Sequence, residues 1–208
     1  MDLAYTAKQQ AFREEVRQWL AANVPAEPLQ SFDTAEGFAQ HRQWEAVLNE
    51  GRWGMVTWPE EFGGRGCDLI DWLIFEEEYY RVRAPLRVNQ NGIFLLGPTL
   101  MEYGTAEQKA RWLRPALEGK LTVAEALTEP RGGSDFFGTT TTARREGDTF
   151  VLEGQKRFIV GAEGADYFLV YARTDPEARP HEGLSAFIVE RGPGVDVEHV
   201  YGLMGTRG

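Results

Sequence analysis

The character of the sequence changes near residue 121, and this change constrains the possible folds more than any single motif. All six tryptophans lie at or before Trp112, whereas nine threonines and thirteen of the 23 glycines lie in residues 122–208. Large side chains at helical spacing favour helices, and threonines with glycine turns favour short strands. The sequence therefore predicts an α+β protein of two domains: an all-helical domain over residues 1–121 and a small antiparallel, β-barrel-like domain over residues 122–208.

Three segments of the first part carry apolar residues at helical spacing, and their ends are marked by helix-capping or helix-ending residues. The segments are residues 12–20, 44–48 and 72–79. Pro25 and Gly51 would end the first two helices, and Asp68 would cap the third. The sequence Thr-Ala-Glu-Gln at residues 105–108 is a capping-box pattern that opens a further helix, which would stop near Gly119.

The solvent exposure of the remaining helical segments can also be predicted. Residues 92–103 are apolar nearly all round, which predicts a buried helix, kinked at Pro98. Three successive glutamates at residues 76–78 predict a solvated helix face. Residues 58–66 (WPEEFGGRG) contain a proline and glycines that interrupt a helix, so we expect an ordered loop there.

Short apolar runs bounded by turn residues predict the strands of the second part. Residues 149–152 and 156–160 flank a Glu-Gly-Gln sequence and predict a hairpin. Residues 167–171 and 184–189 predict two more strands. Several short strands at close spacing are typical of a small barrel or sandwich.

Charge, cysteine content and hydropathy argue against several classes of function. Lys and Arg total 22 against 32 Asp and Glu, and the resulting net charge of −10 argues against binding to a nucleic-acid backbone. One cysteine and three scattered histidines predict neither disulfides nor a metal site. No apolar run is long enough for a membrane span and the N-terminus lacks a signal-peptide pattern, so we expect a soluble, cytoplasmic protein.

The most informative segment for chemistry is the glycine-rich stretch LTEPRGGSD at residues 127–135. Two glycines and a serine after a strand would let the backbone approach an anionic group and would offer amides and a hydroxyl as donors. The stretch matches neither the dinucleotide pattern G-x-G-x-x-G nor a phosphate loop. On residue types alone, a glycine-rich turn without a ligand is the competing interpretation.

Several segments, in order along the chain, resemble motifs of one enzyme family. Residues 126–135 (ALTEPRGGSD) resemble the A-L-T-E-P-x-A-G-S-D signature of acyl-CoA dehydrogenases, and residues 154–159 (GQKRFI) resemble the family strand N-G-x-K-x-W-I-T-N. Three further segments are similar to family motifs: residues 58–64 (WPEEFGG), 103–109 (YGTAEQK) and 204–208 (MGTRG). The resemblance therefore spans the whole chain.

The resemblance implies a helical N-terminal domain, a β-barrel-like middle domain and a third, helical domain, because family members are usually nearly twice this length. It implies FAD-dependent α,β-dehydrogenation of an acyl-CoA thioester to the 2-enoyl-CoA, in which hydrogen-bond donors stabilise the enolate charge that develops on the thioester oxygen. The family's catalytic glutamate lies in the third domain. The resemblance therefore implies no catalytic residue among these 208, and we expect this chain alone to be inactive.

Carried over position by position, the resemblance implies one set of flavin-binding residues and one set of substrate-binding residues. The flavin-binding residues are Glu125 (through its backbone), Leu127, Thr128, Gly133, Ser134, Phe158, Ile159 and Val160. The substrate-binding residues are Asn89, Phe94 and Ser134. Phe158 replaces the usual tryptophan, and Val160 replaces a threonine whose hydroxyl contacts the flavin, so we expect an altered flavin environment.

The resemblance also implies partners. Electron-transferring flavoprotein or a similar protein would accept the electrons, and the chain would form a homo-oligomer or a heteromer. Two other interpretations compete with this one. The first is a non-catalytic partner subunit, or a fragment, that docks on a full subunit; the second is a related flavin oxidase or monooxygenase on the same fold.

Overall fold

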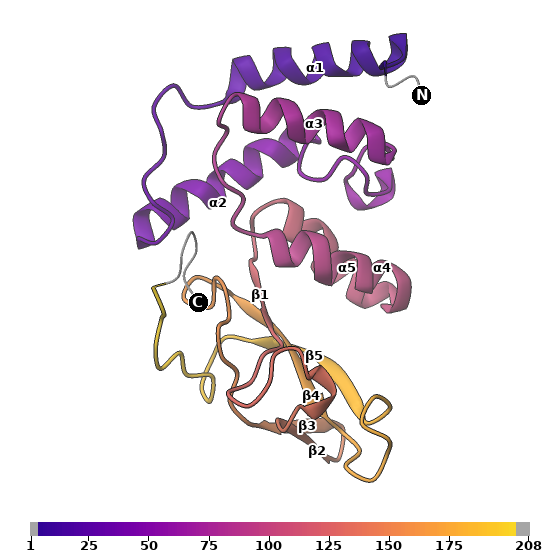
Figure 1. The fold of residues 1–208 in the computed structure, drawn as a ribbon, viewed down its shortest axis with the longest axis vertical. Helices are drawn as coiled ribbons and strands as arrows, with labels where there is room; N and C mark the ends of the chain where they lie inside the picture. Colours follow the sequence, from indigo (N-terminus) through magenta and orange to yellow (C-terminus); the bar gives the residue numbers. More distant parts are fainter. Residues whose placement is uncertain (1–3, 203–208) are drawn as a thin grey trace. The chain divides into compact units, whose positions relative to one another are not determined.

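The computed structural model describes residues 4–202, which form two compact units, and each is described by itself (Figure 1). The helical unit extends to Asn89 and resumes at Gly97–Lys120. The β unit begins at Leu121 and also includes Gln90–Leu96. Within the described residues, no helix is both long and apolar enough to cross a bilayer.

Five α-helices build the helical unit, and their termini lie close to the positions that the capping residues predict. They are α1 (Ala7–Asn23), α2 (Ala35–Glu50), α3 (Leu69–Arg81), α4 (Gly97–Tyr103) and α5 (Ala106–Leu117). Thr6 and Thr105 each make a complete capping box with the glutamine three residues later. The Asp68 carboxylate accepts hydrogen bonds from two amides of the first turn of α3. The helices predicted from residues 12–20, 44–48, 72–79 and 105–108 are confirmed, as is the loop before α3, which contains a 3-10 turn (Glu60–Phe62).

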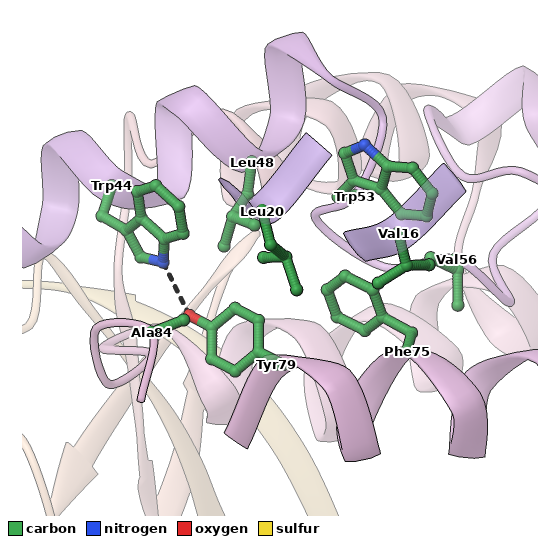
Figure 2. Packing of buried hydrophobic residues seen from close by; sticks show 9 residues of the cluster. All are labelled: Val16, Leu20, Trp44, Leu48, Trp53, Val56, Phe75, Tyr79 and Ala84. Carbon is green, nitrogen blue, oxygen red and sulfur yellow. Dashed lines mark hydrogen bonds between the residues drawn. The ribbon is translucent and has the colours of Figure 1, made fainter. Parts of the chain in front are cut away.

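An aromatic cluster from α1, α2, α3 and the loop after α2 forms the core of the helical unit (Figure 2). Trp53 stacks on Phe75 with their ring planes 5° apart and their centroids 5.6 Å apart. Trp44 Nε1 donates a 2.6 Å hydrogen bond to the hydroxyl of Tyr79, which in turn donates to the carbonyl of Pro85. The buried polar atoms of these rings are therefore satisfied inside the core.

Two predictions of solvent exposure in the helical segments are wrong. Glu78 is buried and forms ion pairs with Arg17 at 2.9 Å and with Arg81 at 2.6 Å, so the glutamate run is not a uniformly solvated face. The predicted buried helix over residues 92–103 is a π-helical turn (Gly92–Leu96) followed by α4, and Phe94 and Tyr103 are exposed. Neither outcome follows from helical periodicity, because burial depends on which neighbouring elements cover a face.

The β unit is a mixed five-stranded sheet, not the predicted antiparallel barrel. Its strands are β1 (Val123–Ala126), β2 (Thr142–Glu146), β3 (Thr149–Glu153), β4 (Tyr167–Arg173) and β5 (Leu184–Glu190). β4 lies at the centre: β1 and β2 pair with it in parallel, while β5 pairs with it antiparallel along its whole length. Among residues 4–202 the sheet does not close. The short-strand pattern identified segments but carries no information about strand direction.

The predicted hairpin is also misplaced. The observed hairpin joins β2 to β3 through Gly147 and Asp148, with Gly147 in the left-handed region at φ 62°. Residues 156–160, predicted as its second strand, are irregular, and Phe158 lies at φ 58°. β2 buries only Ala143, so its sequence, which contains two arginines, offers no apolar run to a hydropathy pattern. The predicted strands at residues 167–171 and 184–189 are confirmed as β4 and β5.

Candidate functional site

The glycine-rich segment after β1 folds into a tight loop closed by two backbone hydrogen bonds. Glu129 and Gly132 each donate an amide hydrogen to the other's carbonyl, at 3.0 and 3.1 Å. Gly133 follows at the surface, and a Cβ built on it would lie 3.6 Å from Cγ2 of Thr128. The loop therefore brings Gly133 back against Thr128, and Ser134 follows as an exposed residue.

A buried carboxylate anchors this loop to the rest of the unit. Oε1 of Glu129 accepts hydrogen bonds from the amide and hydroxyl of Thr141, at 2.9 and 2.6 Å. Oε2 accepts from the amide and hydroxyl of Thr140, both at 2.7 Å. The ammonium of Lys156 lies 2.9 Å from Oε1, and both charged side chains are at least nine-tenths buried.

The surroundings shift the pKa values of this ion pair. Burial by itself would raise the pKa of Glu129, but the hydrogen bonds from Thr141 and Thr140 outweigh it and hold that pKa well below its usual range. Burial lowers the pKa of Lys156, and the bond to Glu129 opposes this shift. Glu129 is therefore ionised at neutral pH and fully engaged in hydrogen bonds, so it is not available as a base.

The two sequence motifs meet at one backbone hydrogen bond. The amide of Arg157 donates to the carbonyl of Thr128 at 2.8 Å, and Lys156 Nζ donates to the carbonyl of Leu127 at 3.2 Å. Consecutive residues of one segment thus bind consecutive carbonyls of the other. The structure therefore places Phe158 close to Thr128 in the fold although the two are far apart in the sequence.

Side chains alternate between two environments along residues 158–160. Ile159 is buried in the cluster that includes Ala126 and Phe168, whereas Phe158 and Val160 are 46% and 44% exposed. A partly exposed phenylalanine and a partly exposed valine thus flank a buried isoleucine in the sequence. Within residues 4–202, the hydroxyl of Thr128 and that of Ser134 have no hydrogen-bond partner.

A pocket of about 540 Å³ lies in the same unit and coincides with the predicted flavin residues only in part. Phe158 and Ile159 line it, but Leu127, Thr128, Gly133, Ser134 and Val160 do not. Arg157 also lines it: its guanidinium lies 4.7 Å from the ring centroid of Phe158 and 5.1 Å from that of Tyr201. In the described part of the chain, the buried Nε of Arg157 has no hydrogen-bond partner.

These features fit the group that the sequence resemblance implies. An isoalloxazine needs a flat apolar contact and donors for its carbonyl and ring-nitrogen edge, which Phe158, Val160 and the Thr128 hydroxyl could supply. Phosphate oxygens need exposed donors, and Ser134 and the amides after Gly132 are of that kind. The residues present therefore fit FAD.

The other predicted site residues lie elsewhere. Glu125 is on β1, where its carboxylate accepts a 3.5 Å hydrogen bond from Tyr171. Phe94 is partly exposed on the π-helical turn, which contacts β1. Asn89 belongs to the helical unit and is fully buried, and its side-chain amide donates to the carbonyl of Ala116 at 2.9 Å. Its assignment to substrate binding stays a prediction.

Sequence reasoning missed the residues that organise the loop. The sequence predicts a hairpin strand at Lys156 and no contact between it and Glu129, yet together these residues join the two motifs. The sequence alone does not single out this pair, because the first motif also contains Arg131 and Asp135 and the second also contains Arg157. Thr140 and Thr141, which complete the carboxylate's hydrogen bonds, carry no signal either.

Residues 6–120 match the acyl-CoA dehydrogenase N-terminal domain, and residues 124–208 match the acyl-CoA dehydrogenase middle domain. The chain belongs to the acyl-CoA dehydrogenase family. Members of this family are flavoproteins and oxidoreductases. The motif at residues 204–208 lies outside the residues that the structure describes.

Comparison with individual relatives agrees with this assignment. The chain is 37% identical to acyl-CoA dehydrogenase IpdE1 of Mycolicibacterium smegmatis, over 94% of this chain and 54% of that protein. The solved Tcur3481-Tcur3483 steroid ACAD is 35% identical, with a TM-score of 0.78 over 91% of this chain and 49% of its own. The ChsE4-ChsE5 complex from Mycobacterium tuberculosis is 32% identical, with a TM-score of 0.75 over 91% of this chain and 48% of its own. The chain thus spans about half the length of these relatives.

Proposed function

We propose that the protein containing this chain catalyses flavin-dependent α,β-dehydrogenation of an acyl-CoA thioester to the 2-enoyl-CoA. The observation that carries the proposal is the hydrogen bond between Arg157 and Thr128, which joins both family motifs into one surface with unpaired donors and exposed apolar side chains. We assign the FAD-binding role to that surface. The proposal is supported by family membership and by the fit of these residues to FAD.

Each residue of the surface has a role that its position allows. The Thr128 hydroxyl would donate to the acceptor edge of the isoalloxazine, and Phe158 and Val160 would pack against the ring. Gly133 lets the loop return against Thr128, and Ser134 would donate to a phosphate oxygen or to the acyl-CoA. The chemistry that FAD supplies when bound is to accept the hydride that leaves the β-carbon.

We assign no α-proton base to this chain. Glu129, an acid within the loop, has its carboxylate engaged by Thr140, Thr141 and Lys156. The sequence resemblance places the base in the family's C-terminal domain. This chain's residues would therefore position the flavin and exclude water from one side of it, while the base acts from another part of the protein.

The test is an assay of the full polypeptide with added FAD, a panel of acyl-CoA thioesters and an artificial electron acceptor. The panel contains straight-chain, branched, aryl and steroid side-chain acyl groups. The expected result is enoyl-CoA formation with at least one member, dependent on FAD. A protein that binds FAD yet oxidises none of the thioesters, while it oxidises another substrate class, would favour the related flavin oxidase or monooxygenase instead.

A second candidate is supported by two of the solved relatives. Their names give two components each, Tcur3481-Tcur3483 and ChsE4-ChsE5. We propose as the alternative that this chain belongs to one subunit of a heteromer, in which a second polypeptide completes the flavin site. FAD binding that requires co-expression of a second, related polypeptide would favour this alternative, and tight binding by the purified polypeptide alone would favour a homo-oligomer. In either case electron-transferring flavoprotein or a similar protein is the proposed electron acceptor.

A further inference from the structure

Lys156 is a buried ammonium that contacts two acceptors from different parts of the loop. Its Nζ lies 2.9 Å from Oε1 of Glu129 and 3.2 Å from the carbonyl oxygen of Leu127, and its side chain is 10% exposed. Burial removes the hydration of an ammonium, and these two contacts replace part of it.

The need to neutralise the charge of Glu129 does not fully explain why a lysine is buried at this position. The carboxylate already accepts four hydrogen bonds from Thr140 and Thr141, two at each oxygen. A carboxylate with that many donors stays ionised in a folded protein without a countercharge. What Lys156 alone supplies is the bond to the Leu127 carbonyl.

That bond acts together with the one made by the next residue. Lys156 Nζ binds the carbonyl of Leu127 and the Arg157 amide binds the carbonyl of Thr128, so both carbonyls of this dipeptide are occupied. With both carbonyls occupied, the Thr128 hydroxyl is left to donate a hydrogen bond to a ligand. This hydroxyl has no partner among residues 4–202. The segment also turns directly afterwards, because Phe158 lies at φ 58°.

We propose that Lys156 is a positioning residue for the flavin: by binding the Leu127 carbonyl and Glu129 together, it fixes the Leu127-Thr128 backbone and the Phe158 side chain in one arrangement. This proposal rests on the proposed function, since it assigns the ligand of that surface as a flavin. Lys156 acts through Leu127 and Glu129 and does not itself contact the flavin.

The test compares Lys156→Met, Lys156→Arg and wild type in the full polypeptide, with Lys120→Met as the matched control. Lys120 is 71% exposed and its ammonium pairs with Glu118 in the helical unit, so its substitution removes an exposed lysine and leaves the loop's bonds intact. For each protein, the Kd for FAD, the visible absorption spectrum of the bound flavin and the unfolding temperature are measured.

The expected result for Lys156→Met is a Kd for FAD raised about three- to tenfold, because the bonds to the Leu127 carbonyl and to Glu129 that order the site are both lost. The flavin spectrum should also change, since the Thr128 donor moves relative to the ring. Lys156→Arg should fall between Lys156→Met and wild type, and Lys120→Met should match wild type.

Three outcomes would overturn the proposal. One is a folded Lys156→Met protein with the wild-type Kd and spectrum. Another is a lower unfolding temperature or a weaker Kd with an unchanged spectrum, which a purely structural role would produce. If Lys156→Met does not fold, Lys156→Arg decides, because a wild-type Kd and spectrum in that variant would show that the position of the cation is unimportant. A wild-type protein that binds no FAD would instead count against the proposed function itself.

Discussion

The amide of Arg157 donates a 2.8 Å hydrogen bond to the carbonyl of Thr128, and this bond brings the two family motifs of the β unit side by side. Phe158, the next residue, has a left-handed backbone conformation with φ 58°, and its ring is 46% exposed. The turn therefore follows directly on the bond to Thr128 and leaves the Phe158 ring partly exposed. Non-glycine residues with positive φ often mark functional sites, because the surrounding structure must stabilise them.

The turn at Phe158 predicts different effects for two substitutions that both remove the ring. A residue with a Cβ is disfavoured in the left-handed region by about 1–2 kcal/mol relative to glycine. We expect Phe158→Gly to be more stable than Phe158→Ala by about 1 kcal/mol, since glycine's greater entropy in the unfolded chain offsets part of the gain. Hydrogen exchange of β-unit amides measures the difference. An alanine variant as stable as the glycine variant would contradict the assigned turn.

The ionised state of Glu129 predicts a pH dependence of stability. Because hydrogen bonds hold the pKa of Glu129 below its ordinary value of 4.5, its stabilising contribution is complete above that pH. The contribution is lost as the pH falls from about 4.5 towards the lower folded-state pKa. We expect Glu129→Gln to destabilise the β unit at pH 7 by about 3–5 kcal/mol, because it leaves Lys156 buried without a countercharge. The difference from wild type should shrink as the pH falls below 4.5.

Glu146→Gln is the control for that measurement. Glu146 forms an exposed ion pair with Arg144 on the surface of β2, so its loss should cost less than about 1 kcal/mol. Residues 122–208 contain no tryptophan, so the β unit is followed by hydrogen exchange of β4 peptides rather than by tryptophan fluorescence. A difference between Glu129→Gln and wild type that stays constant from pH 7 to pH 3 would be evidence against an ionised, hydrogen-bonded Glu129.

The Thr128 hydroxyl predicts a loss of flavin affinity on an isosteric substitution. Thr128→Val keeps the size of the side chain but removes one neutral hydrogen bond, which is worth about 0.5–1.5 kcal/mol. We expect a severalfold higher Kd for FAD in the full polypeptide, and a Kd near wild type for Thr128→Ser. Thr142→Val, at an exposed position on β2, should leave the Kd unchanged. Equal affinities in Thr128→Val and Thr128→Ser would remove the hydroxyl from the site.

In the helical unit, Tyr79 links two buried polar atoms. Tyr79→Phe would leave the indole N–H of Trp44 without its partner inside the core (Figure 2). It would also leave the carbonyl of Pro85 without this donor. An unsatisfied buried group costs about 1–3 kcal/mol, so we expect a loss of stability in that range. Tryptophan fluorescence during denaturation follows this unit. Tyr80→Phe, at an exposed neighbouring position, should be close to neutral, and a loss of the same size there would contradict the argument.

The helices could be predicted from local signals in the sequence. The strand pairing of the sheet and the contacts that build the site could not. Capping residues such as Thr6, Asp68 and Thr105 act within one turn, so their effect is visible in a short stretch of sequence. The parallel pairing of β1 with β4 depends on contacts between distant segments, and a strand pattern does not record them.

The loop at residues 127–135 was identified as a candidate site from its residues and its resemblance to a family motif. Its anchoring is not predicted, because the sequence pattern indicates a hairpin strand at Lys156 and does not pair this residue with Glu129. The burial of both charges follows only from the packing of the loop against residues 140–141 and 156–157. Tertiary packing decides whether an ion pair of this kind is buried. A charged residue in a sequence therefore predicts solvent exposure even where, as here, the fold buries it.

The most direct test of the account is hydrogen exchange of the full polypeptide with and without FAD. We predict slower exchange at the amides of residues 127–134 and 157–160 when FAD is added. The amides of α1 (Ala7–Asn23) should exchange at the same rate in both conditions. FAD binding that leaves residues 127–134 and 157–160 unprotected, while other segments of the β unit become protected, would contradict the assignment of this surface to the flavin.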